Sequence, residues 1–304
     1  MKKLAAITIL ILISKSVIHS FDAFTLSPRI IGVGSSMVAI SSDEGSLFNG
    51  VAGASHRKHW SFTASYAMPY INLDDDDIRQ GYLGIVGPVR NGSLSFAWGN
   101  LSTNIYSEDA ILIGYAKNIA KYFDFLDKAF AGISLKYLRK DYQANRYTLI
   151  DPVFQQGNDI DAFTFDISYQ QEIKNKLRVG FSFENLTKPD LGLKAKDEVE
   201  RVFRIGIAFV KPKDNHYKCV ELSGELNGDD FFGHFGAEYP VFNGLLILRS
   251  GYEFGSERLS NLSFGFGIST FKSKFTLDYA FRISLKGADD DMNGSHYAGI
   301  SYGY

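Results

Sequence analysis

Residues 262–269 read Leu-Ser-Phe-Gly-Phe-Gly-Ile-Ser, and residues 275–285 read Phe-Thr-Leu-Asp-Tyr-Ala-Phe-Arg-Ile-Ser-Leu. In both stretches every second residue is large and apolar, while the residues between are small, polar or charged. Successive side chains of a β-strand point to opposite faces, whereas a helix would mix the two sets on every face. The short link at Lys272-Ser273 therefore joins two predicted antiparallel strands.

The same alternation recurs upstream, for example at Phe163–Tyr169, Leu177–Phe183 and Phe203–Phe209. A period of two repeated along the chain predicts a protein built almost entirely of strands. We expect about fourteen strands, at 59–68, 80–88, 92–100, 109–117, 129–140, 160–172, 176–187, 201–211, 216–227, 231–239, 244–254, 259–271, 274–286 and 295–304.

Three features favour a membrane barrel over a soluble sandwich. Many predicted strands have ten or more residues, which is longer than ordinary strands and long enough to cross a bilayer at a tilt. The apolar face is rich in Phe, Tyr, Ile and Leu, while Gly, Ser and charges lie opposite. Short and long connections mostly alternate, as in bacterial barrels with both termini in the periplasm. We therefore predict an all-β fold, a transmembrane antiparallel β-barrel of about fourteen strands with an N-terminal hatch-like segment.

The composition agrees with a barrel and argues against other classes. The chain of 304 residues has a formal net charge of -2, so no nucleic acid is expected as a partner. Mean hydropathy is close to zero, whereas a helical membrane protein would be far more apolar. The single cysteine, Cys219, excludes an intramolecular disulfide. We expect a bacterial outer-membrane protein whose surroundings are outer-membrane lipids and lipopolysaccharide.

The N-terminus is typical of a secretory signal peptide at residues 1–20. Lys2 and Lys3 precede an apolar run from Leu4 to Ile13, which is too short to span a bilayer as a helix. Cleavage is expected after Ser20 or Ala23. The expected organisation is then a periplasmic or hatch segment at 21–55, followed by the barrel at 56–304.

The stretch from Ser27 to Ser55 is rich in glycine and serine and moderately apolar. It is too long for a simple tail, and we predict that it enters the barrel as a hatch. The alternative is a disordered periplasmic lead-in. The residues that carry the hatch hypothesis are Gly32, Gly34, Met37, Asp43, Phe48 and Asn49.

The last predicted strand carries an expected barrel-insertion signal, formed by Gly299, Tyr302 and the final Tyr304. The terminal strand must close the sheet and remove its edge, and outward aromatic residues lie at the membrane interface.

No catalytic residue, cofactor site or metal site is predicted, and the protein is not expected to be an enzyme. The sequence has no nucleophile elbow, no paired histidines at metal-ligand spacing and no phosphate loop, although a Ser-His arrangement formed only in the fold is left open. Two acidic clusters, Asp74–Asp77 and Asp289–Asp291, fall in predicted outer loops. They are either solvated loop residues or a divalent-cation site near lipopolysaccharide head groups.

The face opposite the apolar columns carries charges of both signs. Because opposite charges across a narrow barrel tend to pair, we predict a network that stiffens and partly plugs the lumen, with an open ion-selective channel as the alternative. The predicted lumen charges are Lys136, Asp166, Arg178, Glu184, Arg204, Arg249, Asp278 and Arg282, together with Glu221, Glu225, Glu238 and Glu253.

Several motifs resemble the PorV/PorQ family of outer-membrane proteins, which is itself similar to the FadL-like barrels. The N-terminal match rests on Gly32, Gly34, Ala39, Asp43, Asn49 and Gly53, although the family's usual Asn-Pro-Ala is replaced by Asn49-Gly50-Val51. Later matches are Gly132–Tyr137, Glu184–Leu186 with Arg204–Gly206, Leu248–Tyr252 and Leu277–Phe281.

This resemblance implies a fourteen-stranded barrel that serves protein secretion or surface attachment, with type IX-like secretion subunits or secreted cargo as partners. Two other hypotheses stay open. One is a FadL-like transporter of hydrophobic compounds, with hydrophobic small molecules as its ligands. The other is a structural barrel with a plugged lumen. The sequence names no substrate or cargo and no oligomeric state.

Overall fold

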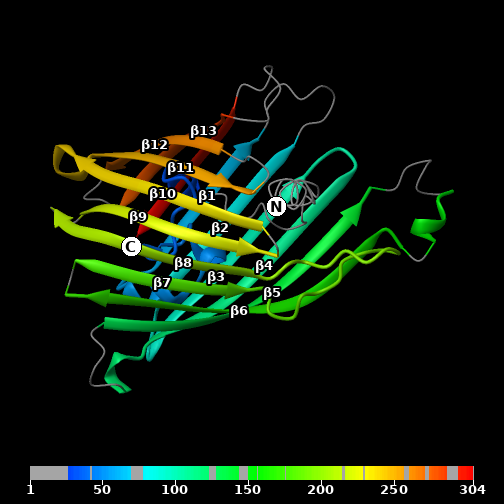
Figure 1. The fold of residues 1–304 in the computed structure, drawn as a ribbon, viewed down its shortest axis with the longest axis horizontal. Coiled ribbons are helices and arrows are strands. Elements are labelled where there is room, and N and C mark those ends of the chain that lie inside the picture. Colours follow the sequence, from blue (N-terminus) through cyan, green and yellow to red (C-terminus); the bar gives the residue numbers. More distant parts are fainter. Residues whose placement is uncertain are drawn as a thin grey trace, which may run out of the picture.

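A closed antiparallel β-barrel forms the whole framework of the protein (Figure 1). The computed structural model describes residues 27–41, 43–69, 78–122, 128–143, 150–155, 157–174, 176–213, 216–228, 230–256, 260–270, 274–285 and 294–303, without the side chains of 212, 213 and 216–218. Each strand pairs with its neighbours in sequence, and β1 closes the sheet by pairing with β14 from Ser61↔Gly303 to Met68↔His296.

Fourteen strands lie within the described part of the chain. Their bounds are β1 Ser61–Met68, β2 Arg79–Val89, β3 Gly92–Ser102, β4 Tyr106–Asn118, β5 Lys128–Tyr142, β6 Asp159–Ile173, β7 Leu177–Glu184, β8 Val202–Lys213, β9 His216–Asn227, β10 Asp230–Val241, β11 Leu246–Gly255, β12 Ser260–Thr270, β13 Phe275–Ser284 and β14 Ser295–Gly303.

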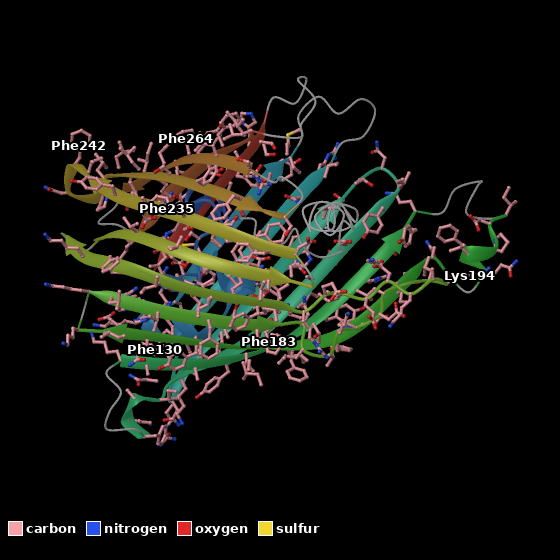
Figure 2. The ribbon with its side chains drawn as sticks, in the orientation of Figure 1. Phe130, Phe183, Lys194, Phe235, Phe242 and Phe264 are labelled. Carbon is pink, nitrogen blue, oxygen red and sulfur yellow. The ribbon has the colours of Figure 1, made fainter. Side chains whose placement is uncertain are left out.

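Large apolar side chains project from the outer face of the barrel. On β12 Phe264 and Phe266 are 49% and 40% exposed, whereas the neighbouring Ser263, which points to the opposite face, is fully buried. Figure 2 shows Phe235 and Phe264 on the outside of the ribbon. Water does not favour so continuous an apolar surface, so this face requires lipid. No helix in the described ranges is long and apolar enough to span a membrane.

The predicted fold is confirmed, and most strand ends lie within three residues of the expected positions. The main difference is at β7, which ends at Glu184 and not at residue 187. Asn185 has a φ of 55°, and its backbone N–H donates to Asp166 at 2.9 Å. This left-handed turn, which asparagine tolerates, ends the strand.

The two ends of the barrel differ in their connections. At the end where β1 begins, called the inner end, short turns join β2 to β3, β6 to β7 and β10 to β11. A 3-10 turn at Ala120–Tyr122 lies in the longer β4–β5 connection. At the outer end, residues 185–201 form a long connection whose arms meet at the Asp190↔Glu198 bridge.

The buried apolar core lies inside the barrel. Residues of the N-terminal segment, such as Ile30, Met37 and Leu47, are almost fully buried against the inward faces of the strands. The N-terminal segment therefore fills the barrel. The apolar side chains of the strands' outer face are not part of this core.

A charge on the outer face should destabilise the barrel strongly. Phe264 lies near the middle of β12, opposite Phe281 of β13. We expect Phe264→Arg to lower the free energy of unfolding in lipid vesicles by about 2–4 kcal/mol, because an arginine at mid-bilayer is poorly solvated. Urea titration of the vesicle-folded protein measures this loss. Phe264→Leu is the control, and equal stability of the two variants would show that this face does not meet lipid.

Candidate functional site

The N-terminal segment from residue 27 to 57 lies in the lumen, apart from residue 42, which is outside the description. Its short helix α2, Pro28–Gly32, packs against β11 to β14. Its 3-10 turns η1, Leu47–Asn49, and η2, Ala52–His56, pack against the opposite wall, from β2 to β6. The segment therefore crosses the interior from one wall to the other, and the drawing shows it in blue inside the strands (Figure 1).

Glycines on the inward face of the strands let the backbone of this segment approach the wall. Gly34 has a φ of +63°, and a Cβ placed there would lie 2.6 Å from the backbone nitrogen of Tyr252. A Cβ on Gly251 would in turn lie 2.1 Å from the nitrogen of Gly34. Close backbone approach of this kind needs glycine. The same explanation covers Gly180 and Gly236, whose added Cβ atoms would meet backbone oxygens of Val38 and Val33.

Two buried side chains bind backbone groups of the segment that no helix or sheet satisfies. The carboxylate of Glu221 accepts hydrogen bonds from the N–H groups of Val38, Ala39 and Ile40, at 2.7, 3.1 and 3.0 Å. The amide nitrogen of Gln170 donates to the carbonyls of Ala39 and Ser41, at 2.6 and 3.0 Å. Irregular backbone at membrane depth is tolerated where protein satisfies its polar groups.

An alternating row of charges fixes the start of the segment. Arg29 pairs with Asp43 within the segment and, through Nε, with Glu238 of β10 at 2.9 Å. Glu238 also accepts from Arg249 of β11 at 2.7 Å, and Arg249 reaches Asp278 of β13 at 2.6 Å. Each buried charge thus has a partner of opposite sign, as burial requires.

A second row of polar contacts follows the wall from β5 to β12. Lys136 pairs with Asp166 at 3.0 Å, and Arg204 pairs with both Glu184 and Glu225. His234 lies between Glu225 and Glu253, at 3.5 and 3.7 Å, and its Nδ1 is 3.1 Å from the carbonyl oxygen of Gly34. Asn261 donates to Glu253 at 3.2 Å.

Part of the inward face of β2 to β5 is different, because apolar side chains gather there. Leu47, Phe48, Val51 and Ala54 of the segment pack there in one cluster. The inward-facing members from the strands are Tyr82, Val86, Ala97, Ala110, Leu112 and Leu138, with Ile160 and Ala162 of β6 beside them. We call this group of packed side chains the apolar compartment.

The outer connection at residues 185–201 covers the apolar compartment. Leu191 and Val199 belong to the same cluster and are 1% and 2% exposed. Lys140 of β5 pairs with Asp197 and so holds the connection against the barrel. Tyr82 donates to the backbone oxygen of Glu44 at 2.5 Å, which fixes the segment below. The outer connection and the N-terminal segment therefore both pack against the inward-facing apolar residues of β2 to β5.

The predicted hatch residues all lie inside the barrel. Gly32, Gly34 and Met37 lie near the wall against which α2 packs. Asp43 pairs with Arg29, and Phe48 and Asn49 are buried in η1. Whether they act as a hatch stays a prediction.

The predicted lumen charges are all on inward-facing positions. Arg178 pairs with Glu172 at 3.0 Å, and Arg282 lies over the ring of Tyr297 at 5.7 Å and is only partly buried. Of the insertion signal, Gly299 and Tyr302 are in β14, while Tyr304 lies outside the described residues. The acidic clusters 74–77 and 289–291 and the signal peptide are also outside them. Among the described residues no group of three or more His, Cys, Asp or Glu side chains could hold a metal ion.

Sequence reasoning missed the apolar compartment and the loop residues Leu191 and Val199. A signal was present in β4, where Ala110-Ile111-Leu112-Ile113 is apolar on both faces and does not alternate. A strand that is apolar on both faces is buried on both.

Comparison with known proteins places the fold. No family model matches the chain, and no curated protein matches it. Solved structures do match: the CymD monoaromatic hydrocarbon channel has a TM-score of 0.67 and 11% identity over 94% of this chain and 99% of that one. The Ralstonia pickettii toluene transporter TbuX gives 0.62 and 11%, over 93% and 99%. A Pseudomonas aeruginosa FadL homologue gives 0.53 and 12%, over 92% and 98%.

The fold is that of the FadL-like barrels. At these identities the likeness covers the architecture of the chain and not its ligand.

Loss of the Glu221 carboxylate should loosen the segment. We expect Glu221→Gln to speed hydrogen exchange at the amides of 38–40 by at least about tenfold, because an amide accepts more weakly than a carboxylate and adds donors facing other donors. Exchange followed by mass spectrometry on the folded protein measures the effect. Glu198→Gln, on the outer connection, is the control. Unchanged exchange in Glu221→Gln would mean that apolar packing alone retains the segment.

The segment should also be sensitive to acid through His56. Burial, with the nearby Arg178 cation, lowers the pKa of His56 to about 4. The neutral ring lies 2.9 Å from the Gln170 side-chain oxygen. Because the folded pKa is below the unfolded value, its contribution is complete above about pH 6.5 and is lost as the pH falls toward 4. We expect the unfolding free energy of His56→Gln to fall less than that of the wild type over this range. Parallel pH profiles would contradict this.

Proposed function

We propose that this protein passes small hydrophobic compounds across the bacterial outer membrane. The observation that carries the proposal is the apolar compartment, which lies in the same lumen as the rows of paired charges. A route for ions or sugars would gain nothing from such a surface, whereas an apolar solute loses its contact with water there.

The residues that pack in the compartment suggest where such a solute enters and leaves. Within this cluster Leu191 and Val199 come from the outer connection, and Leu47 and Phe48 come from the N-terminal segment. Since all four are nearly fully buried, a ligand must displace either the loop or the segment. The loop is tied near its start by hydrogen bonds from Leu186 and Thr187 to backbone oxygens of β6, and farther along by the pair of Lys140 with Asp197, whose aspartate side chain is 46% exposed. The segment is held by buried ion pairs and hydrogen bonds on both walls, so the tip of the loop is the easier of the two to move.

The structural neighbours support the same class of cargo. Two of them are described as a monoaromatic hydrocarbon channel and a toluene transporter. They share the fold and not the sequence, so the chemical class is carried over here and no individual substrate. Their architecture also supports an outer-membrane location, which in turn fits the expected signal peptide at residues 1–20.

A role in secretion of the PorV/PorQ type is the second candidate. It rests on the sequence motifs at Gly132–Tyr137 and Leu248–Tyr252, which lie on β5 and β11. No structural neighbour named above is a secretion component, and the motifs fall in strands where barrel packing alone explains them.

The apolar lid residues provide the test of transport. We expect the double variant Leu191→Asn with Val199→Asn to bind a fluorescent long-chain fatty acid or toluene about tenfold more weakly, because it places amides over the apolar compartment. Binding to the purified protein and uptake by cells that carry it as their one such channel are both measured. Leu186→Asn, on the same connection but outside the cluster, is the control.

Equal binding and uptake by the lid variant and its control would remove the basis for the proposal. A pull-down from outer membranes in mild detergent separates the two candidates. Hydrophobic compounds in the eluate favour transport, whereas secretion subunits or secreted proteins favour the PorV/PorQ role.

A further inference from the structure

Charge is distributed unequally between the two ends of the barrel. At the inner end, exposed cations stand at the entry to β1 and at five connections between strands: Lys58, Arg90, Lys121, Lys128, Lys174, Lys176, Lys211 and Lys274. Among the described residues of this end, the carboxylate Glu172 is buried and paired with Lys128 and Arg178. The described surface of the inner end therefore exposes cations and no carboxylate.

The outer end has a different pattern, because its charges of both signs neutralise each other. Arg139 pairs with Asp141 and Asp159, each at 3.2 Å, and Lys188 lies 3.2 Å from Glu198 and 3.1 Å from Glu200. The contrast between the ends is thus a property of the inner end and not of a generally basic chain, whose net charge is -2. The undescribed side chains of the inner connections add three aspartates and three lysines, which leaves the excess unchanged: Asp124, Asp127, Asp214, Lys213, Lys218 and Lys272.

Lys211, and with it the half-buried Lys117 at the inner end of β4, continue columns of side chains on the outer face. Residues two apart on a strand share a face. Lys117 follows Tyr115 in this way on β4, and Lys211 follows Phe209, which is 67% exposed, on β8. Lysine side chains extend along apolar surface and carry their charge to the polar boundary. These ammonium groups therefore lie at the level of lipid head groups.

Aromatic and apolar residues mark the same boundary. Tyr122 is 56% exposed, and the ammonium groups of Lys117 and Lys121 lie 5.1 and 5.0 Å from its ring centre. Trp60 is 41% exposed beside the start of β1. At the β10–β11 turn, which carries no lysine or arginine, Phe242 is 76% exposed, and Figure 2 labels it at the end of the barrel opposite Lys194. Aromatic residues of this kind anchor barrels at a membrane interface.

We propose that the inner end binds anionic phospholipid head groups of the periplasmic leaflet through this ring of cations. The distribution of the cations selects the partner. A folded protein or a polymer strand would contact one arc of the rim. The cations instead occur at the entry to β1 and at every inner connection except the β10–β11 turn, and a lipid leaflet is what surrounds a barrel on every side. Phosphate groups complement the charge, and each lysine near an anionic surface adds to the affinity.

The test compares lipids with and without net charge on the full mature protein. The folded protein in mild detergent is titrated with phosphatidylglycerol and with phosphatidylcholine, and retained lipid is counted by native mass spectrometry. We expect phosphatidylglycerol to be retained with at least about tenfold higher affinity. Raising the salt to about 0.5 M should remove most of that preference, because surface charges are screened.

Matched variants locate the effect. Lys117→Gln, Lys174→Gln and Lys211→Gln together should reduce the preference to within about threefold. The outer-end set Lys188→Gln, Lys194→Gln and Lys196→Gln makes the same change in charge and should leave the preference intact. Equal retention of the two lipids by the wild type would overturn the proposal, as would an unchanged preference in the inner-end variant.

The salt titration of the wild type keeps the proposal testable if the triple variant does not fold. A preference that survives 0.5 M salt would also overturn it. Retention of a soluble anionic polymer, such as peptidoglycan fragments, without any preference among phospholipids would reject a lipid partner and assign the ring to that polymer. None of these outcomes depends on whether hydrophobic compounds are transported.

Discussion

The structure depends on the rule that a strand in lipid cannot leave backbone N–H and C=O groups unpaired. Pairing of β1 with β14 satisfies the last edge, so closure and membrane insertion are the same requirement. Once the sheet is closed, every side chain points either to lipid or to the lumen. The alternation of the sequence follows directly, with Phe264 and Phe266 on one side and Ser263 on the other.

Closure of so many strands also leaves an interior that the N-terminal segment fills. An eight-stranded barrel is filled by its own inward side chains, but a fourteen-stranded one encloses more space. Here the segment occupies that space, and the wall is shaped to receive it. Glycines such as Gly251 allow backbone to touch backbone, while Glu221 and Gln170 bind groups that a helix or sheet would have satisfied. In the apolar compartment the segment and the strands meet through apolar side chains.

The fold could be predicted from the sequence because the signal is local and repeated. Period-two alternation survives small errors in the strand ends, as at β7, where the predicted end was three residues too far. The identity of the lumen charges could also be predicted, since parity alone decides which face a residue occupies. Their partners could not, because Arg29 and Glu238 are 209 residues apart and nothing local relates them. The inward turn of residues 185–201 escaped prediction for the same reason.

The contacts of α2 have a consequence for the order of assembly. This helix precedes all fourteen described strands in the sequence, yet its contacts are with β11 to β14, which come after the other ten. Contacts between residues so distant in sequence form late, since the chain between them must first be ordered. The segment can reach its final position only when the closing hairpins are present. The segment therefore docks only after the barrel is complete, and an unfinished barrel would have an empty interior.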